Sequence, residues 1–166
     1  MYSRLKTWWV VLIPAFDPAR PATFGKLSAS GSVLVMKRIA DTGLLKAVLD
    51  RADEHHQWAS EQFRAHAPFH TCEPVLDELA FLVGDPRLGM KLVARGDLVL
   101  DFQLADHVGE VLALLEKYAD VPMDLADACI VRMTELQDRC KVWTTDASDF
   151  KIFRRNRRQV IPVEVP

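Results

Sequence analysis

The chain has 166 residues, 49% of them hydrophobic and 27% charged, a balance typical of a single soluble globular domain. Its net charge of −2 neither indicates nor excludes a nucleic-acid partner, because such contacts depend on where the charges lie. Three cysteines without a Cys-x-x-Cys pair exclude an ordinary disulfide framework and favour a reducing, cytoplasmic setting. No apolar run approaches the roughly 20 residues of a membrane-spanning helix, so we expect no membrane insertion.

Residues 1–35 differ in composition from the rest of the chain. An apolar burst at residues 8–13 is followed by Pro14, Pro18 and Pro21, and then by glycines and serines typical of a linker. We therefore predict an N-terminal extension over residues 1–35, either disordered or produced by a start site placed too far upstream, and a domain over residues 36–166. In the alternative, residues 8–13 add an edge strand or dock a partner.

From residue 36 onward, strand patterns alternate with helix patterns. In chain order, we predict a strand at 37–40, helices at 42–49, 54–66, 72–83 and 87–94, a strand at 97–102, helices at 104–118 and from 124, and strands at 141–145 and 159–165. Such alternation predicts an α/β fold with three layers, in which helices cover both faces of a central, mainly parallel sheet.

Acidic residues stand at the ends of the apolar strands and inside apolar helices. Asp41 and Asp146 each close a predicted parallel strand, so both belong to the edge of the sheet where α/β proteins bind ligands. Asp127 lies near the start of a helix, and Glu78 lies inside one. A carboxylate is costly to bury unless it is compensated, and several converging carboxylates indicate a divalent cation.

The same residues also have an ordinary structural interpretation. Asp41 could cap the helix that follows it, Asp124 and Asp127 could form a capping pair, and Asp146 and Asp149 could be turn residues. Glu78 has no such role, because it lies within a helix among apolar neighbours.

The order of these motifs resembles the PIN-domain ribonucleases, in particular the VapC-type toxins of bacterial toxin–antitoxin pairs. The family pattern is an Asp after the first strand, a Glu in a following helix, an Asp-Ala pair opening a late helix, and Thr-x-Asp closing the next strand. The matching residues are Asp41, Glu78, Asp127 with Ala128, and Thr144-Thr145-Asp146, followed by Asp149-Phe150. The resemblance covers residues 36–165. It departs from the family at Leu44-Leu45-Lys46, where many relatives carry a small residue or proline, and Lys46 could face solvent or an RNA phosphate.

The resemblance implies an endoribonuclease that depends on Mg²⁺ or Mn²⁺ and that has Asp41, Glu78, Asp127 and Asp146 as catalytic residues. The metal would be held by Asp41, Asp127 and Asp146, with Asp124 and Asp149 as further candidates. A cognate antitoxin and a second copy in a homodimer are the partners that the resemblance implies.

A basic run follows the last acidic motif. It is expected to contact RNA phosphates near the metal, since arginine offers paired donors to phosphate, and consists of Lys151, Arg154, Arg155, Arg157 and Arg158. A solvated basic loop, or a docking site for an acidic partner, is the alternative.

Other functions remain compatible with parts of the pattern. A PIN-type nuclease of housekeeping RNA processing would share every site residue, and a non-catalytic binding protein would use the carboxylates as caps and turns. An aspartyl-phosphate enzyme of the haloacid-dehalogenase type is disfavoured, because it needs an Asp two residues after the nucleophile and position 43 is Gly.

Overall fold

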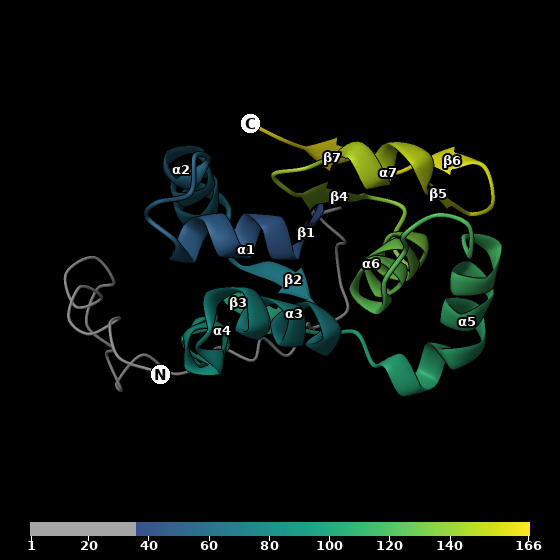
Figure 1. Cartoon of the computed structure of the whole chain (residues 1–166), viewed down its shortest axis with the longest axis horizontal. Coiled ribbons are helices and arrows are strands. Elements are labelled where there is room, and N and C mark those ends of the chain that lie inside the picture. Colours follow the sequence, from purple (N-terminus) through teal and green to yellow (C-terminus); the bar gives the residue numbers. More distant parts are fainter. Residues whose placement is uncertain (1–35) are drawn as a thin grey trace, which may run out of the picture.

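A parallel five-stranded sheet organises residues 36–166, the part of the chain that this computed structural model describes (Figure 1). The predictions for residues 1–35 lie outside the described residues. The strands of the sheet are β1 (Lys37–Ala40), β2 (Phe69–Thr71), β3 (Leu98–Leu100), β4 (Cys140–Trp143) and β7 (Val163–Glu164). Their order across the sheet is β3-β2-β1-β4-β7, and all four pairings are parallel.

Helices connect the strands, and a short hairpin completes the described fold. The helices are α1 (Thr42–Leu49), α2 (His56–His66), α3 (Glu73–Val83), α4 (Pro86–Ala94), the 3₁₀ turn η1 (Leu104–His107), α5 (Val108–Lys117), α6 (Leu125–Glu135) and α7 (Ser148–Ile152). The hairpin pairs β5 (Arg154–Arg155) with β6 (Gln159–Val160) in antiparallel fashion. In Figure 1, α1 and α2 lie to the left of β1, and α6 and α5 lie to its right.

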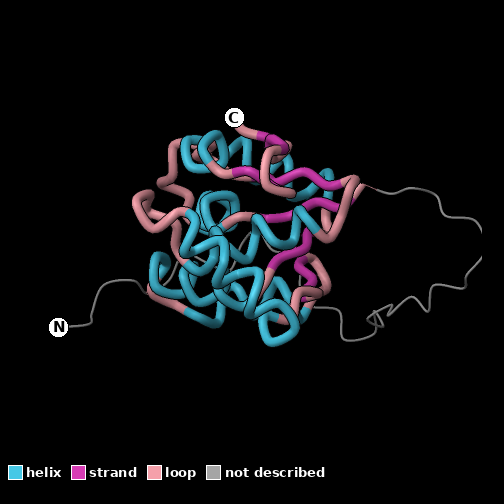
Figure 2. The backbone as a smooth tube through the Cα atoms, turned by 90° about the vertical axis from the view of Figure 1, so that its right-hand side faces the viewer, coloured by secondary structure: helices cyan, strands magenta, loops and turns pink. Residues whose placement is uncertain are grey.

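The two faces of the sheet pack against different helices, which confirms the predicted three-layer α/β/α architecture. On one face, Phe63 of α2 stacks on Phe69 of β2, whose ring also meets Trp143 of β4 edge-on. Cys140 lies three residues before Trp143, so its side chain points to the other face, where its thiol donates to the carbonyl of Thr134 in α6. In Figure 2, helices in cyan lie alongside the strands in magenta.

The sequence predicted the first half of the fold more closely than the second. The strand at 37–40 and the helix at 42–49 are confirmed with the predicted bounds, and the helices at 54–66, 72–83 and 87–94 are confirmed to within two residues. The strand predicted at 159–165 is wrong, because Ile161 and Pro162 separate β6 in the hairpin from β7 in the sheet. Strand β2 was not predicted at all.

Two further observations concern the cysteines and the length and hydropathy of the helices. Cys72, Cys129 and Cys140 are buried free thiols. Among the helices between residues 36 and 166, none combines the length and the apolar character needed to cross a membrane.

Candidate active site

Asp41 lies at the carboxyl end of β1, where its side chain is held by the end of β4. Asp41 occupies the N-cap position of α1, but its side chain makes no capping hydrogen bond. Its Oδ2 instead accepts a hydrogen bond from Thr144 Oγ1 at 2.7 Å. The interpretation of Asp41 as a simple helix cap is therefore wrong.

The environment of Asp41 disfavours its charged form. Burial raises the pKa of Asp41 from 3.8 to about 6; the Thr144 hydrogen bond opposes this rise, and the negative charge of Glu78 adds to it. The carboxyl of Asp41 thus lies close enough to Glu78 for the two charges to repel each other.

Glu78 reaches the same edge of the sheet from α3. Its Oε2 accepts a hydrogen bond of 2.6 Å from the hydroxyl of Thr42, the residue directly after Asp41. The sequence indicated that Glu78 had no capping role, but it gave no signal for Thr42 as its partner. The next residue, Gly43, allows a close approach of α1 to the end of β4, because a Cβ added there would lie 2.7 Å from Thr145 Oγ1.

Asp124 and Asp127 form a capping box at the start of α6. The amide of Asp127 donates to Asp124 Oδ1 at 2.8 Å, and the amide of Asp124 donates to Asp127 Oδ2 at 3.4 Å. The capping interpretation is therefore confirmed for this pair. It does not account for the pKa of Asp127, which is raised to about 7 by burial and then by the charges of Asp124, Asp41 and Asp149.

Asp146 is the most exposed of the four carboxylates expected to be catalytic, and it stabilises a turn. Its Oδ1 accepts hydrogen bonds from the amide and the hydroxyl of Ser148, and these bonds lower the pKa of Asp146. Its own amide donates to Thr144 Oγ1 at 3.2 Å, which connects this turn to Asp41. Asp149 follows in the first turn of α7.

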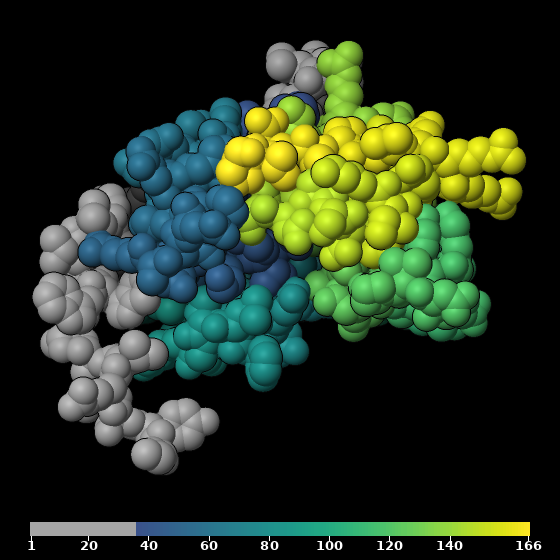
Figure 3. Space-filling view, turned by 45° about the horizontal axis from the view of Figure 1, so that its top comes forward, coloured from purple at the N-terminus to yellow at the C-terminus, as the bar shows by residue number. Residues whose placement is uncertain are grey.

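These carboxylates lack an ion-pair partner between residues 36 and 166, although the charge of Lys151 contributes to the lowered pKa of Asp146. Six of them gather at the carboxyl edge of the sheet, and none takes part in an ion pair within the described part of the chain: Asp41, Glu78, Asp124, Asp127, Asp146 and Asp149. In Figure 3 the first described residues, in purple, are visible in a depression between the blue, teal and yellow-green segments.

The carboxylate oxygens are chemically suitable ligands for a hard divalent cation, but they do not surround a common point in this structure. Carboxylate oxygens are what Mg²⁺ and Mn²⁺ prefer, and burial, followed by the charges of neighbouring carboxylates, raises the pKa values of Asp41 and Asp127. Between residues 36 and 166, no three His, Cys, Asp or Glu side chains already stand in a metal-binding arrangement. Binding would therefore need the carboxylates to close around the ion.

Comparison with known proteins identifies the fold. No family model and no curated protein matches the sequence. Among solved structures, VapC20 of Mycobacterium tuberculosis, a toxin that cleaves the sarcin–ricin loop, superposes with a TM-score of 0.58 at 16% identity, over 68% of this chain and 92% of that one. A chain of the DNA-bound VapBC complex from Salmonella typhimurium gives a TM-score of 0.52 at 21% identity, over 79% of this chain and 98% of that one. The chain has a VapC-type PIN fold.

Within this VapC-type fold, the basic run is not grouped beside the carboxylates as expected. The β5–β6 hairpin contacts the C-terminal end of α6, where the amide of Asn156 donates to Glu135 Oε1 at 2.9 Å. Asp127 lies eight residues earlier on the same helix, about 12 Å away along its axis. The expectation thus fails for Arg155, which lies at the far end of α6, whereas Lys151 and Arg154 stay at α7, the helix that also carries Asp149.

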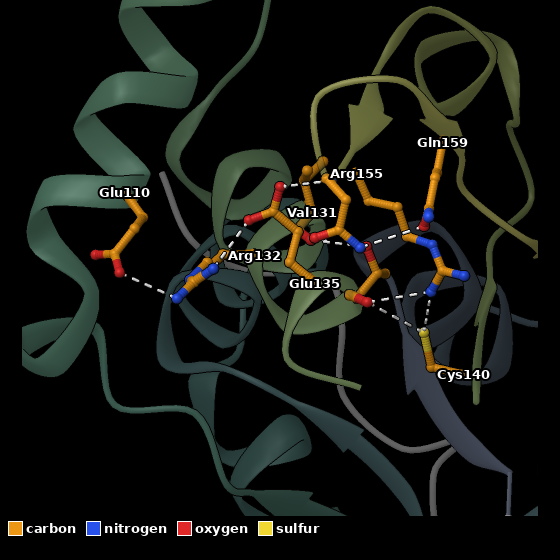
Figure 4. Close-up of polar contacts among 9 residues, drawn as sticks. Glu110, Val131, Arg132, Glu135, Cys140, Arg155 and Gln159 are labelled. Carbon is orange, nitrogen blue, oxygen red and sulfur yellow. Dashed lines mark hydrogen bonds and ion pairs between the residues drawn. The ribbon is translucent and has the colours of Figure 1, made fainter. Parts of the chain in front are cut away.

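Two arginines of the run have structural partners, and Figure 4 shows the contacts of Arg155. Arg155 Nη1 donates to the carbonyl of Thr134 at 3.1 Å and lies 3.4 Å from both the carbonyl of Gln137 and Cys140 Sγ, so it caps the C-terminal end of α6. Arg154 Nη1 donates to three carbonyls of the α7 end, those of Lys151, Ile152 and Phe153. RNA contact by these two side chains stays a prediction, and it competes with these bonds.

Lys46, which departs from the usual VapC pattern, has a partner of its own. Its Nζ lies 2.7 Å from Asp53 Oδ2, and this pairing raises the pKa of Lys46. The preceding residues, Leu44 and Leu45, are fully buried in the core. The VapC-type fold thus accommodates the departure by burying the two leucines and turning Lys46 towards the loop after α1.

Proposed function

We propose that the protein is an endoribonuclease dependent on Mg²⁺ or Mn²⁺ and the toxin of a VapBC-type toxin–antitoxin pair. The observation that carries the proposal is that Asp41 at the end of β1, Glu78 of α3 and Asp127 of α6 converge on one edge of the sheet. The pKa values of Asp41 and Asp127 are raised, and none of the three carboxylates has a cationic partner among residues 36–166. The fold shared with VapC20, a toxin that cleaves the sarcin–ricin loop, supports the proposal.

The proposed roles follow from the position of each carboxylate. Asp41, Asp127 and Asp146 hold the cation, Glu78 completes the set, and Asp124 and Asp149 are further ligands. When bound, the ion neutralises charge on the scissile phosphate and activates a water molecule. Burial and the neighbouring carboxylates raise the pKa of Asp127 to about 7, and a bound cation would favour the ionised form of this carboxyl.

The proposed partners are RNA and an antitoxin, with a second copy of the chain in a homodimer. Lys151, Arg157 and Arg158 are exposed and suit phosphate contact, whereas Arg154 and Arg155 would first have to leave their carbonyl partners. Three buried free thiols agree with action in a reducing cytoplasm.

Two alternatives differ in what they predict. A housekeeping PIN-type nuclease would use the same residues, and a small antitoxin gene next to this one would decide between the two. A non-catalytic binding protein is favoured by the capping box of Asp124 and Asp127 and by the turn at Asp146. It predicts a melting temperature that does not change with Mg²⁺ or Mn²⁺.

The direct test is cleavage of a labelled pool of tRNA and rRNA by the purified full-length chain, freed of any bound antitoxin. We expect cleavage with Mn²⁺, none with EDTA, and loss in Asp41→Asn. Asp138→Asn is the matched control, because Asp138 is an exposed carboxylate at the other end of α6. If well-folded protein leaves the RNA intact in Mn²⁺, the nuclease proposal fails and the binding-protein alternative gains.

A further inference from the structure

Two buried threonines each donate a hydrogen bond to a carboxylate of another element. Thr42, at the start of α1, donates to Glu78 of α3 at 2.6 Å, and Thr144, at the end of β4, donates to Asp41 at 2.7 Å. We propose that Thr42 and Thr144 are positioning residues that hold Glu78 and Asp41 at the acidic edge of the sheet before any cation arrives, so that fewer side chains have to move when one binds. The proposal rests on the proposed function, because it assigns these hydroxyls to the same site.

The first step of the argument is that Glu78 and Asp41 would separate without these bonds. Glu78 bonds to Thr42 at 2.6 Å, and Thr42 directly follows Asp41 in the chain, so two carboxylates of like charge lie at one edge of the sheet and repel each other. A glutamate on a helix surface has several rotatable bonds with which to reach water. A hydroxyl that donates to a carboxylate makes a strong, charge-assisted hydrogen bond and favours the ionised form. Thr42 therefore keeps Glu78 at the sheet edge despite the repulsion.

The second step is that the two donors are themselves fixed. Thr42 and Thr144 are only 3% and 1% exposed, and their branched side chains have few rotamers within packed surroundings. Each hydroxyl is therefore held by the core, while the carboxylate that it contacts, Glu78 or Asp41, is only half-buried. The packed core thereby restricts the movement of two carboxylates that are partly exposed to solvent.

The third step is that the bonds form a continuous chain of contacts across the site. Thr144 Oγ1 accepts the amide of Asp146 at 3.2 Å while it donates to Asp41, so it connects two proposed ligands. Asp41 and Thr42 are consecutive in sequence, and their side chains bond in opposite directions, to β4 and to α3. The carboxylates of Glu78 and Asp41 and the backbone amide of Asp146 are thereby connected through two hydroxyls.

A purely structural role would make the same bonds but would not affect ion binding, and Thr134 offers the matched control. Thr134 is also fully buried, and its hydroxyl donates to a backbone carbonyl, that of Val131, at 2.7 Å within α6. Replacing each threonine by valine removes one buried hydroxyl at nearly constant volume. Only at positions 42 and 144 does the loss release a carboxylate.

The experiment compares Mn²⁺ affinity, by isothermal titration calorimetry, and thermal unfolding for the full-length wild type, Thr42→Val, Thr144→Val and Thr134→Val. We expect Mn²⁺ affinity to fall about tenfold or more in the first two variants, as for a lost hydrogen bond to a charged group, and to stay within about twofold in Thr134→Val. Thr42→Ser and Thr144→Ser keep the hydroxyl and should restore most of the affinity.

A double-mutant cycle tests whether Thr42 acts through Glu78. In a Glu78→Gln background, the additional change Thr42→Val should lower Mn²⁺ affinity by less than twofold, because the carboxylate that Thr42 holds is gone. Equal affinity losses at positions 42, 144 and 134, or failure of the serine variants to restore binding, would overturn the proposal. If a valine variant does not fold, its serine counterpart and the Glu78→Gln pair still decide.

The outcome for RNA is separate. Wild type that binds Mn²⁺ in a Thr42-dependent manner but cleaves no RNA would remove the nuclease function and leave the positioning role intact. Wild type that binds no Mn²⁺ would overturn the positioning role, whatever happens to RNA.

Discussion

Two carboxyl groups with raised pKa values make the stability of the protein depend on pH. The pKa of Asp41 is about 6 and that of Asp127 about 7, against an ordinary value of 3.8. The folded protein therefore keeps protons that the unfolded chain releases near pH 4. Since the native state binds more protons across this window, its stability falls as the pH rises from about 4 to about 7. A bound cation removes the cause of this loss.

Asp127→Asn should therefore stabilise the metal-free protein above pH 7. Asparagine keeps an oxygen that can accept the amide of Asp124, so the capping box survives while the unfavourable charge is lost. We expect a gain on the order of 1–2 kcal/mol at pH 8, after allowance for solvent screening, and almost none at pH 4. Urea unfolding in EDTA at both pH values measures it, and an equal effect at both would contradict the electrostatic explanation.

Gly43 should be replaceable only at a cost, unlike the helical glycine of α5. In Gly43→Ala, the new Cβ would meet Thr145 Oγ1 at 2.7 Å and the Thr144 hydroxyl at 3.3 Å, so we expect a loss of about 1–3 kcal/mol. Gly109 has open space around the same position, and Gly109→Ala should gain up to about 1 kcal/mol from helix propensity. Thermal denaturation compares the two, and a stabilised Gly43→Ala would show that α1 has room to move.

At the scale of elements, the β5–β6 hairpin and Arg155 complete the C-terminal end of α6. The last carbonyls of a helix have no intrahelical partners, and Arg155 donates a hydrogen bond to one of them, the carbonyl of Thr134. The neighbouring Glu135 accepts both the amide of Asn156 and Arg132 Nη1. Arg132 also extends to Glu110 of α5 at 3.0 Å, so one polar cluster joins α5, α6 and the hairpin.

Arg155→Ala should therefore destabilise the fold by about 1–3 kcal/mol, because it removes the charged donor that caps the last carbonyls of α6. Arg158→Ala is the matched control in the same hairpin, since Arg158 is exposed and its change should stay within about 0.5 kcal/mol. Urea unfolding curves of the two variants provide the comparison. Similar stabilities would mean that the Arg155 contacts contribute little in water.

The elements that the sequence predicted well are those with a strong local pattern. Asp41 separates β1 from α1, and Asp50 follows the end of α1. The apolar residues of both elements face the core, so local and tertiary preferences agree. Strand β2 has only three residues and lacks such a pattern; its place is set by pairing with β1 and β3. In α5, Val108 and Leu112 fit helical spacing but are more than half exposed, since the packing face runs through Val111 and Leu114 instead.

At the scale of the whole molecule, the parallel sheet explains why distant carboxylates meet. Asp41 follows β1, Asp146 follows the neighbouring β4, and the helices that carry Glu78 and Asp127 pack beside these two strand ends. Motif order and the parallel-sheet rule predicted this convergence. The hydroxyl contacts of Thr42 and Thr144 and the cap made by Arg155 depend on the approach of separate elements, which no local pattern encodes.

The central claim is that these carboxylates form one site for a divalent cation, and proton release tests it most directly. Mn²⁺ is titrated into the full-length protein in two buffers of different ionisation enthalpy, at pH 6 and at pH 8. The account predicts saturable binding that is lost in Asp41→Asn, with protons released at pH 6 and almost none at pH 8, because Asp41 and Asp127 titrate between these values. Binding that is absent, unchanged in Asp41→Asn, or free of proton release at both pH values would contradict it.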